Sequence, residues 1–390
     1  MKNKLINGLL LLFGITLMSC SGNKFAFNLN EIEKNRVLKN ADSFLTQNPI
    51  TITASVCNRS AGNQHDFYSE GDYWWPDAQN PNGPYIRKDG LTNPDNFTAH
   101  REALIRFSQI SGALASAYVL TNDEKYAQHL VIHLRAWFIN ENTKMNSNLL
   151  FAQAIKGVAT GRGIGIIDTV HLVEVTKAIQ AIEKSKALSN SDLSAIKIWF
   201  SNYLHWMTTH EYGISERDNG NNHSVCWALQ VAAFADLIGD SETLSFCKNF
   251  YKNTLLPNQM DKNGSFPLEL KRTKPYGYSL FNLDAMASIC QILSTKEDNL
   301  FAFTTPDGKN LALGLTFLEP YIATKSAWPY QKDVMYWEEW PVRQSSLLFG
   351  GLALKNNSYL NLWKNLKSDY TSAEIIRNMP VHYPIIWIRA

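Results

Sequence analysis

Two short polar runs carry most of the side chains in this chain that could do chemistry. The first runs from Glu216 to His223 and holds a carboxylate, adjacent amides and an imidazole. The second runs from Glu269 to Tyr278 and adds a carboxylate, a guanidinium and two phenols. Both lie between segments with the periodicity of apolar helices, which need no such density of polar groups in order to fold. We therefore expect the two runs to meet at one cleft.

These groups suit an elimination across a uronic acid unit. The C5 proton of such a unit is a very weak acid while the adjacent carboxylate keeps its charge, so that charge must first be neutralised. Asn222, Arg272 and Glu216 are the candidates for this role. A base must then take the proton, and an acid must protonate the departing O4. The helix dipole would keep His223 neutral and able to act as a base, and a tyrosine beside a guanidinium can act as acid or base.

Each signal also has an ordinary structural interpretation. The paired asparagines would cap the helix that follows them, with His223 merely in its first turn. Lys271 and Arg272 would form a solvated basic face, and Tyr278 would be an aromatic residue of the core or its rim. It is the combination of the two runs that favours a catalytic cleft.

Further residues are candidates to line a groove for the sugar chain. The long loop 58–96, which we call the aromatic loop, is rich in turn-forming residues. Its aromatic run offers flat faces for pyranose rings beside two basic residues. The alternative is that its tryptophans are buried and anchor the loop. The substrate-binding candidates are Tyr73, Trp74, Trp75, Arg87, Lys88, Gln153, Arg162, His171, Asn221, Lys271 and Tyr276.

In combination, these motifs resemble the alginate lyases that have an α/α toroid fold. The resemblance covers roughly residues 73–283, and it is closer to polysaccharide lyase family thirty-eight than to family five. Family five has an aromatic residue where this chain has Cys226, and a longer spacer before its tyrosine. The motifs are Asn221-Asn222-His223-Ser224 with Trp227, Asp261-Lys262-Asn263-Gly264, Pro267-Leu268-Glu269-Leu270-Lys271-Arg272 and Tyr278-Ser279-Leu280.

The resemblance implies a role for each catalytic candidate. His223 would remove the C5 proton from one epimer, with Tyr278 as the acid. For the other epimer Tyr278 would be both base and acid. Asn222, Arg272 and Glu216 would neutralise the carboxylate. The nearby second phenol leaves some ambiguity, which the Ser-Leu pair after Tyr278 resolves in its favour.

The rest of the chain predicts an all-α fold. No strand alternates with helices at the spacing of βαβ units, and successive antiparallel helix pairs have one economical closed arrangement, an α/α toroid. We expect an incomplete barrel of antiparallel helix pairs, with residues 31–390 as one domain and 381–388 as a short strand or extended closing segment. The candidate helices are 30–47, 101–120, 123–138, 165–185, 191–211, 222–239, 243–254, 279–295, 310–324, 338–354 and 357–366.

The first residues predict export. Lysines and a short apolar run end at a small residue before Cys20, which resembles a bacterial lipobox. We expect residues 1–20 to be a lipoprotein signal peptide, Cys20 to carry the lipid and residues 21–30 to be a tether. The protein would then be a periplasmic or outer-membrane lipoprotein that touches the membrane only through its anchor. The alternative is an ordinary signal peptide with an incidental cysteine.

Composition limits the partners. The 37 basic and 35 acidic residues give a formal net charge of +2, too small a field to recruit nucleic acid, so a polyanion must be gripped by a local basic groove. We expect a monomer that binds an acidic polysaccharide, alginate or glucuronan, and no nucleic acid. His129 and His133 lack a third ligand nearby, so we expect no metal or other cofactor.

The four cysteines after Cys20 allow three complete pairings, and the sequence does not choose among them. Cys226, Cys247 and Cys290 lie in apolar, helix-like contexts that favour buried free thiols.

Three other functions compete with an alginate lyase. A lyase for glucuronan or another polyuronate would use the same residues. An inverting glycoside hydrolase would need two carboxylates across the cleft, for which Asp168 and Glu216 are conceivable. A non-catalytic glycan-binding lipoprotein would use the aromatic loop and the basic residues without needing His223 or Tyr278.

Overall fold

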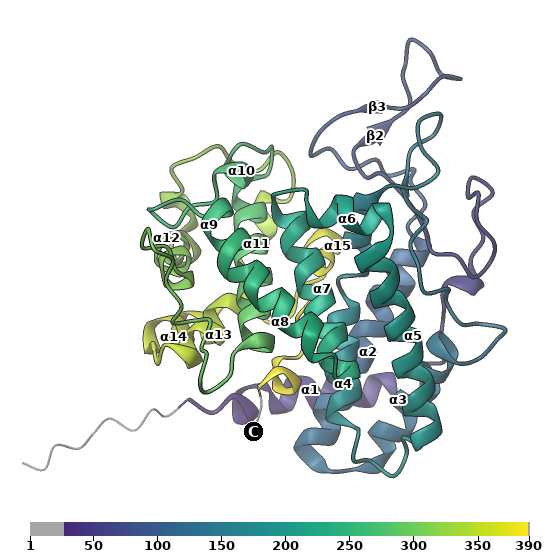
Figure 1. The fold of residues 1–390 in the computed structure, drawn as a ribbon, viewed down its shortest axis with the longest axis horizontal. Coiled ribbons are helices and arrows are strands. Elements are labelled where there is room, and N and C mark those ends of the chain that lie inside the picture. Colours follow the sequence, from purple (N-terminus) through teal and green to yellow (C-terminus); the bar gives the residue numbers. More distant parts are fainter. Residues whose placement is uncertain (1–26, 389–390) are drawn as a thin grey trace, which may run out of the picture.

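The structure, a computed structural model, describes residues 27–388. Five helices form an inner layer in which each packs against the next, as Figure 1 shows. The inner helices are α2 (Ala99–Thr121), α4 (Leu172–Ala181), α7 (Asn222–Ile238), α11 (Pro275–Leu293) and α13 (Ser345–Ala353). Nearly every residue of α7 and α11 is buried, as expected for helices that are apolar on all faces.

A second layer of helices covers the first. Two of its members pack on α2 and two on α7, one packs against both α11 and α13, and one packs on α13. This arrangement of inner and outer helices is the predicted α/α toroid, and the all-α class is confirmed. The outer helices are α1 (Leu29–Phe44), α3 (Glu124–Phe138), α5 (Asn190–Thr209), α8 (Ser241–Phe250), α12 (Leu311–Ala323) and α14 (Asn357–Asn365).

Short elements gather at one end of the helical body. The loop expected at 58–96 contains three of the four strands; β1 pairs in parallel with β4, and β2 pairs antiparallel with β3. Figure 1 shows β2 and β3 outside the helical layers, at the end where α6 and α15 also lie. These elements are β1 (Tyr68–Glu70), β2 (Trp74–Trp75), β3 (Ile86–Arg87), β4 (Phe151–Ala154), α6 (Glu211–Arg217), α9 (Leu256–Gln259), α10 (Pro267–Leu270) and α15 (Ala373–Arg377).

Several helix boundaries differ from the predictions. The helix expected at 165–185 begins as a 3-10 segment, Gly163–Thr169, before α4. The helix expected at 338–354 begins only at Ser345, because Pro341 cannot continue a helix. α8 is followed by a π-helical turn, Tyr251–Leu255. The tail is a 3-10 turn, Pro384–Trp387, rather than a strand, and it packs on α1, α2 and α4.

Buried free thiols are confirmed for Cys226, Cys247 and Cys290, and Cys57 is also free. The predicted leader, Cys20 and most of the tether lie outside the described residues. Among the described helices, α2 alone is long and apolar enough to cross a membrane, and it is a buried core helix.

A buried carboxyl group fastens the C-terminal segment to the inner layer. Glu174 of α4 accepts the backbone N–H of Tyr383 at 2.7 Å and the indole N–H of Trp387 at 2.5 Å. Burial raises the pKa of Glu174 to about 8, although these donors oppose the shift. The carboxyl group is therefore protonated in the folded protein at neutral pH.

Because the folded pKa of Glu174 lies above its ordinary value of 4.5, its contribution to stability is complete below pH 4.5 and is lost as the pH rises toward 8. Glu174→Gln keeps an acceptor and does not titrate. Between these pH values the variant should lose on the order of 3 kcal/mol less unfolding free energy than the unsubstituted protein. Urea unfolding across this range measures the difference. Glu183→Gln, at an exposed position, is the control, and equal slopes for the Glu174 variant and the unsubstituted protein would contradict the prediction.

Candidate active site

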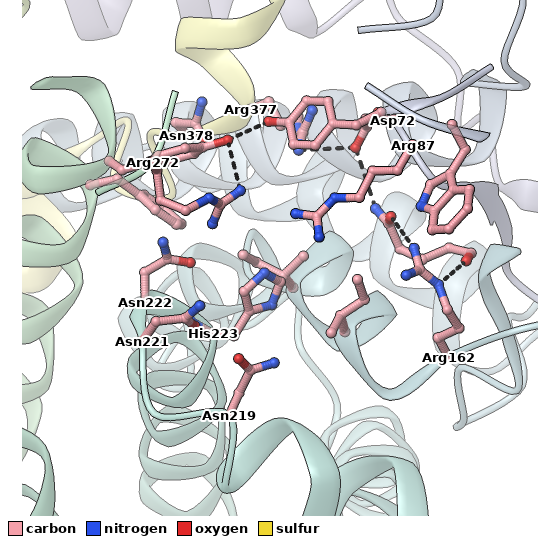
Figure 2. Close-up of a pocket in the computed structure, with 17 residues that line it drawn as sticks. Asp72, Arg87, Arg162, Asn219, Asn221, Asn222, His223, Arg272, Arg377 and Asn378 are labelled. Carbon is pink, nitrogen blue, oxygen red and sulfur yellow. Dashed lines mark hydrogen bonds and ion pairs between the residues drawn. The ribbon is translucent and has the colours of Figure 1, made fainter. Parts of the chain in front are cut away.

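A cleft of about 460 Å³ opens where the short elements meet the inner helices (Figure 2). Both polar runs of the sequence reach it, as do the aromatic loop, β4 and the end of α15. Four guanidinium groups face a single carboxyl group among the described residues that line it. The lining residues are Asp72, Tyr73, Trp74, Arg87, Gln153, Arg162, Ile164, Ile167, Asn219, Asn221, Asn222, His223, Arg272, Tyr278, Phe281, Arg377 and Asn378.

The first polar run turns into α7 at the cleft. Gly220 has a φ of +86°, a left-handed conformation that glycine adopts without strain. Asn221 caps the helix, since its side-chain oxygen accepts the N–H of His223 at 3.0 Å. The capping interpretation is therefore correct for Asn221, and the cap brings the next two residues to the cleft.

Asn222 is held by a buried carboxyl group of the second polar run. Its backbone N–H and its side-chain amide donate to the two oxygens of Glu269, at 2.8 and 2.7 Å. Burial raises the pKa of Glu269, and these two donors act against the shift. The two polar runs thus meet as predicted, and the contact fixes the orientation of the Asn222 amide.

His223 rests on a second buried carboxyl group. Its Nδ1 lies 2.7 Å from Oε1 of Glu216, whose side chain has no exposed surface. The carboxylate of Glu216 accepts a hydrogen bond from Nδ1–H, so Nδ1 carries the hydrogen and the lone pair remains on Nε2. Glu216 was expected to meet the substrate carboxylate. The structure corrects this placement, because Glu216 is behind the imidazole and does not line the cleft.

Tyr278 lies in the first turns of α11, with its hydroxyl 2.6 Å from the hydroxyl of Tyr73. The guanidinium of Arg272 lies 4.6 Å from the centre of its ring, and Nη2 is 3.5 Å from its hydroxyl. Burial raises the pKa of Tyr278 well above its usual value, and the nearby Tyr73 adds to the rise. Arg272 lowers the pKa, as the sequence suggested, but does not overcome burial, so the phenol of the free protein holds its proton.

Ion pairs connect the aromatic loop to the side of the cleft that carries Arg272 and Tyr278. Asp89 accepts from Arg272 at 3.2 Å and from Arg87 at 2.6 Å. These contacts place both guanidinium groups at the cleft. Trp75 and Lys88, by contrast, do not line the cleft. Nζ of Lys88 lies 5.0 Å from the ring centre of Trp75.

The opposite wall is built by β4 and the turn that follows it. Gln153 has a φ of +55°, an uncommon conformation for a residue with a side chain. Its side-chain amide donates to Asp168 at 3.1 Å, and its backbone carbonyl accepts from Nε of Arg162 at 2.8 Å. Arg162 also lies 5.8 Å from the ring of Trp74. Burial and the nearby Arg87 lower the pKa of Arg162 to about 10, so it remains a cation at neutral pH.

Three other predicted groove residues do not reach the cleft. His171 is buried against the carbonyl of Arg377, at 2.9 Å. Tyr276 is buried and donates to the carbonyl of Tyr321 at 3.0 Å. Lys271 is exposed but outside the lining. The placement of His171 and Tyr276 in the groove was wrong, because residue type alone does not distinguish a satisfied core position from a cleft position. Lys271 is instead an exposed basic side chain, as its ordinary structural interpretation expected.

Four polar residues that line the cleft were not predicted from the sequence: Asp72, Asn219, Arg377 and Asn378. Asn219 and Asp72 stand next to motifs that were recognised, so their neighbours were a usable signal. Arg377 and Asn378 lie about one hundred residues after the second polar run, and no local pattern distinguishes them.

The chain matches the family model described as alginate lyase over residues 51–328. It belongs to the alginate lyase family. The structure is similar to an alginate lyase from Bacteroides ovatus with 30% identity and a TM-score of 0.78, over 92% of this chain and 93% of that one. It shares its fold with alginate lyase A1-III from Sphingomonas species A1, with 12% identity and a TM-score of 0.55, over 91% and 95% of the two chains.

A histidine variant of A1-III complexed with a tetrasaccharide is also similar, with 13% identity and a TM-score of 0.54, over 80% and 84% of the chains. Among curated proteins, none matches the sequence significantly.

The contact between His223 and Glu216 predicts a fixed tautomer. In nitrogen NMR at neutral pH, Nδ1 of His223 should carry the proton, and Glu216→Leu should shift the ring toward the Nε2–H form. His100 is the control, because its Nδ1 accepts the N–H of Tyr68 at 2.9 Å and its Nε2 faces the carbonyl of Ser55. His100 should keep the Nε2–H form in both proteins. An Nε2–H signal for His223 with Glu216 present would refute the geometry.

Proposed function

We propose that the protein cleaves the 1,4 linkages of alginate by β-elimination, leaving an unsaturated 4-deoxy uronate at the new non-reducing end. The observation that carries this proposal is the meeting of an oriented imidazole, a protonated phenol and a guanidinium at one cationic cleft. Family membership and the alginate lyases of similar fold support the substrate class.

Neutralisation of the uronate carboxylate falls to Asn222 and Arg272. The amide of Asn222 is oriented by Glu269, and Arg272 supplies a positive charge beside the phenol. Donors arranged in advance stabilise the charge that develops as C5 loses its proton, without reorganising at that moment. Each such interaction contributes on the order of 10²–10³ in rate.

His223 is the base for one epimer at C5. Nε2 holds the lone pair, and Glu216 stabilises the imidazolium that forms when Nε2 takes the proton. The electron pair of the C5–H bond becomes the C4–C5 double bond as the C4–O4 bond breaks.

Tyr278 is the acid that protonates O4. Its raised pKa keeps the proton available at neutral pH. For the epimer whose C5–H lies on the side of Tyr278, the phenol would first lose its proton to solvent. The phenolate would then take the C5 proton and give it to O4, so one side chain would serve as both base and acid.

The other candidate functions find less support. An inverting hydrolase needs two carboxyl groups across the cleft, yet Asp168 and Glu216 are both buried outside the lining. Asp72 does line the cleft, but Arg101 and Arg377 hold its pKa well below its usual range despite burial, so it cannot act as an acid. A glycan-binding protein would not require the pairing of His223 with Glu216. A glucuronan lyase is the remaining alternative, and membership in family thirty-eight stays a prediction.

Export and lipidation at Cys20 also remain part of the proposal. A lipid-anchored lyase would act on polysaccharide outside the cytoplasm. Mass spectrometry of the membrane fraction would detect the acylated cysteine.

Tyr278→Phe should lower turnover on alginate by about 10³-fold or more, because the acid is lost while the ring remains. Ultraviolet absorbance of the unsaturated product measures the rate on mannuronan, guluronan, glucuronan and pectate. Tyr276→Phe is the matched control, since it removes a buried hydroxyl outside the cleft and should keep most of the turnover. Unchanged turnover in Tyr278→Phe would refute the mechanism. New reducing ends without absorbance would identify a hydrolase.

His223→Gln should separate the two epimers. Turnover on the polymer whose C5 proton faces the imidazole should fall by about 10²–10⁴-fold. Turnover on the other polymer should fall much less, because Tyr278 is its base. Rates on mannuronan and guluronan blocks measure the ratio. Equal losses on both polymers would show that His223 has no epimer-specific role.

A further inference from the structure

Lys274 is a buried cation beside the two tyrosines of the cleft. Its side chain is 4% exposed. It directly precedes α11, and its carbonyl accepts the N–H of Tyr278 at 3.0 Å. Its Nζ lies 5.1 Å from the ring centre of Tyr73, 5.5 Å from that of Tyr278 and 5.2 Å from that of Tyr336. The ammonium group is therefore surrounded by phenol rings whose faces attract a cation.

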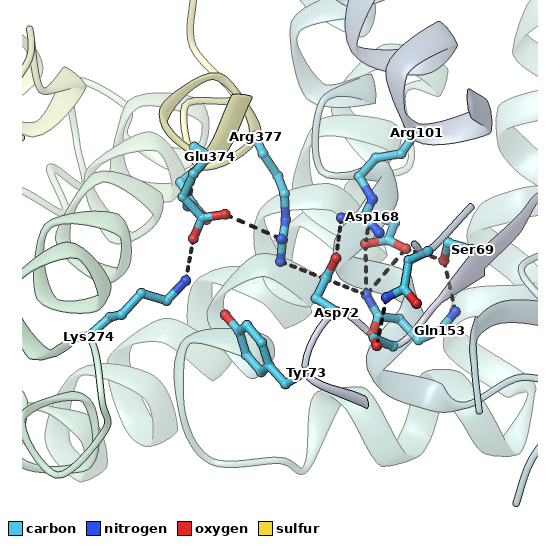
Figure 3. A network of polar contacts seen from close by, with 12 residues as sticks. Ser69, Asp72, Tyr73, Arg101, Gln153, Asp168, Lys274, Glu374 and Arg377 are labelled. Atoms are coloured by element: carbon cyan, nitrogen blue, oxygen red, sulfur yellow. Dashed lines mark hydrogen bonds and ion pairs between the residues drawn. The ribbon is translucent and has the colours of Figure 1, made fainter. Parts of the chain in front are cut away.

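A chain of alternating charges holds this ammonium group in place (Figure 3). Lys274 pairs with Glu374 at 2.5 Å, Glu374 with Arg377 at 3.4 Å, and Arg377 with Asp72 at 3.0 Å. Burial alone would lower the pKa of Lys274, but Glu374 and Tyr73 together outweigh burial and the pKa is raised. The lysine thus keeps its charge where an unpaired amine would lose it.

The two ends of this chain stand beside the two tyrosines. Asp72 precedes Tyr73 in the aromatic loop, and Lys274 is one helical turn from Tyr278. Figure 3 shows the hydroxyl end of Tyr73 turned toward the ammonium group. The ion pairs therefore join the aromatic loop to the wall that carries the phenol of Tyr278.

We propose that Lys274 is a positioning residue for the lyase reaction, whose ammonium group holds Tyr73 and Tyr278 together and stabilises the negative charge that Tyr278 carries after giving up its proton. This inference rests on the proposed function. When the C4–O4 bond breaks, O4 takes the proton of Tyr278 and a phenolate remains. His223 holds the proton from C5, and exchange with solvent restores both groups before the next turnover.

Burial opposes the phenolate of Tyr278 most strongly, and Tyr73 and Glu374 also oppose it, whereas Arg272 favours it. The ammonium group of Lys274, whose Nζ lies 5.5 Å from the ring centre, brings a further positive charge that would favour the phenolate. Glu374 is shared with Arg377, which offsets its charge. Removal of the ammonium group should therefore make the phenolate less stable, in a setting where water screens little.

The test places 3,5-difluorotyrosine at position 278, whose phenol ionises nearer to neutral pH and reports its charge by fluorine NMR. In Lys274→Met the titration midpoint should rise by about one to two pH units, because the nearby positive charge is lost. Lys274→Arg retains a cation and should keep the midpoint within about half a unit. A merely structural role for Lys274 would leave the midpoint unmoved in both variants.

Turnover on alginate with the natural tyrosine is measured in parallel. Lys274→Met should lower kcat by about tenfold or more with a smaller change in KM, and Lys274→Arg should restore part of the loss. Should Lys274→Met fail to fold, Lys274→Gln supplies a neutral side chain that can still donate to Glu374. A midpoint that does not move in the neutral variant overturns the inference. Absence of unsaturated product from the unsubstituted enzyme would instead overturn the proposed function, because the titration needs no substrate.

Discussion

The cleft depends on carboxyl groups that are buried and paired with the side chains on its surface. Glu216 supports His223, Glu269 supports Asn222, and Glu374 supports Lys274. Burying such groups is costly unless each one is bonded. The hydrogen bonds and ion pairs to these neighbours offset the cost of burial, and they also fix the direction of the neighbouring side chains. The consequence is a cleft whose working groups are oriented before a substrate arrives.

The same constraint explains the electrostatic character of the site. Glu216, Glu269 and Glu374 are buried behind the surface. Four guanidinium groups line the cleft, and Asp72 is the one carboxyl group among the described residues that line it. Arg87 and Arg272 share one carboxylate, Asp89, while Arg162 contacts the neutral carbonyl of Gln153. A polyanion therefore meets positive charge at the cleft although the net charge of the chain is only +2.

Most of the fold could be predicted from the sequence because long helices leave a strong periodic pattern. α2, α3 and α7 begin and end within about two residues of the predicted limits. Predictions failed where the backbone departs from the α-helix, as in the 3-10 segment Gly163–Thr169 and the closing turn Pro384–Trp387. Apolar content is alike in these conformations, so periodicity cannot distinguish them.

The catalytic candidates could be predicted where they cluster in the sequence, and the more isolated candidates Gln153 and Arg162 also line the cleft. The Asn222-His223 pair and the Arg272 to Tyr278 run were found because amides, an imidazole and phenols cluster there. Arg377 was missed because tertiary packing alone brings it to the cleft. Glu216 was found, but its role as the partner behind His223 needed coordinates.

The position of α15 also bears on how the protein is made. This short helix carries Glu374 and Arg377, yet it comes near the end of the chain, after every inner helix has been synthesised. The cleft therefore lacks Arg377, and Lys274 lacks its buried partner Glu374, until this late segment has docked on the helical layers.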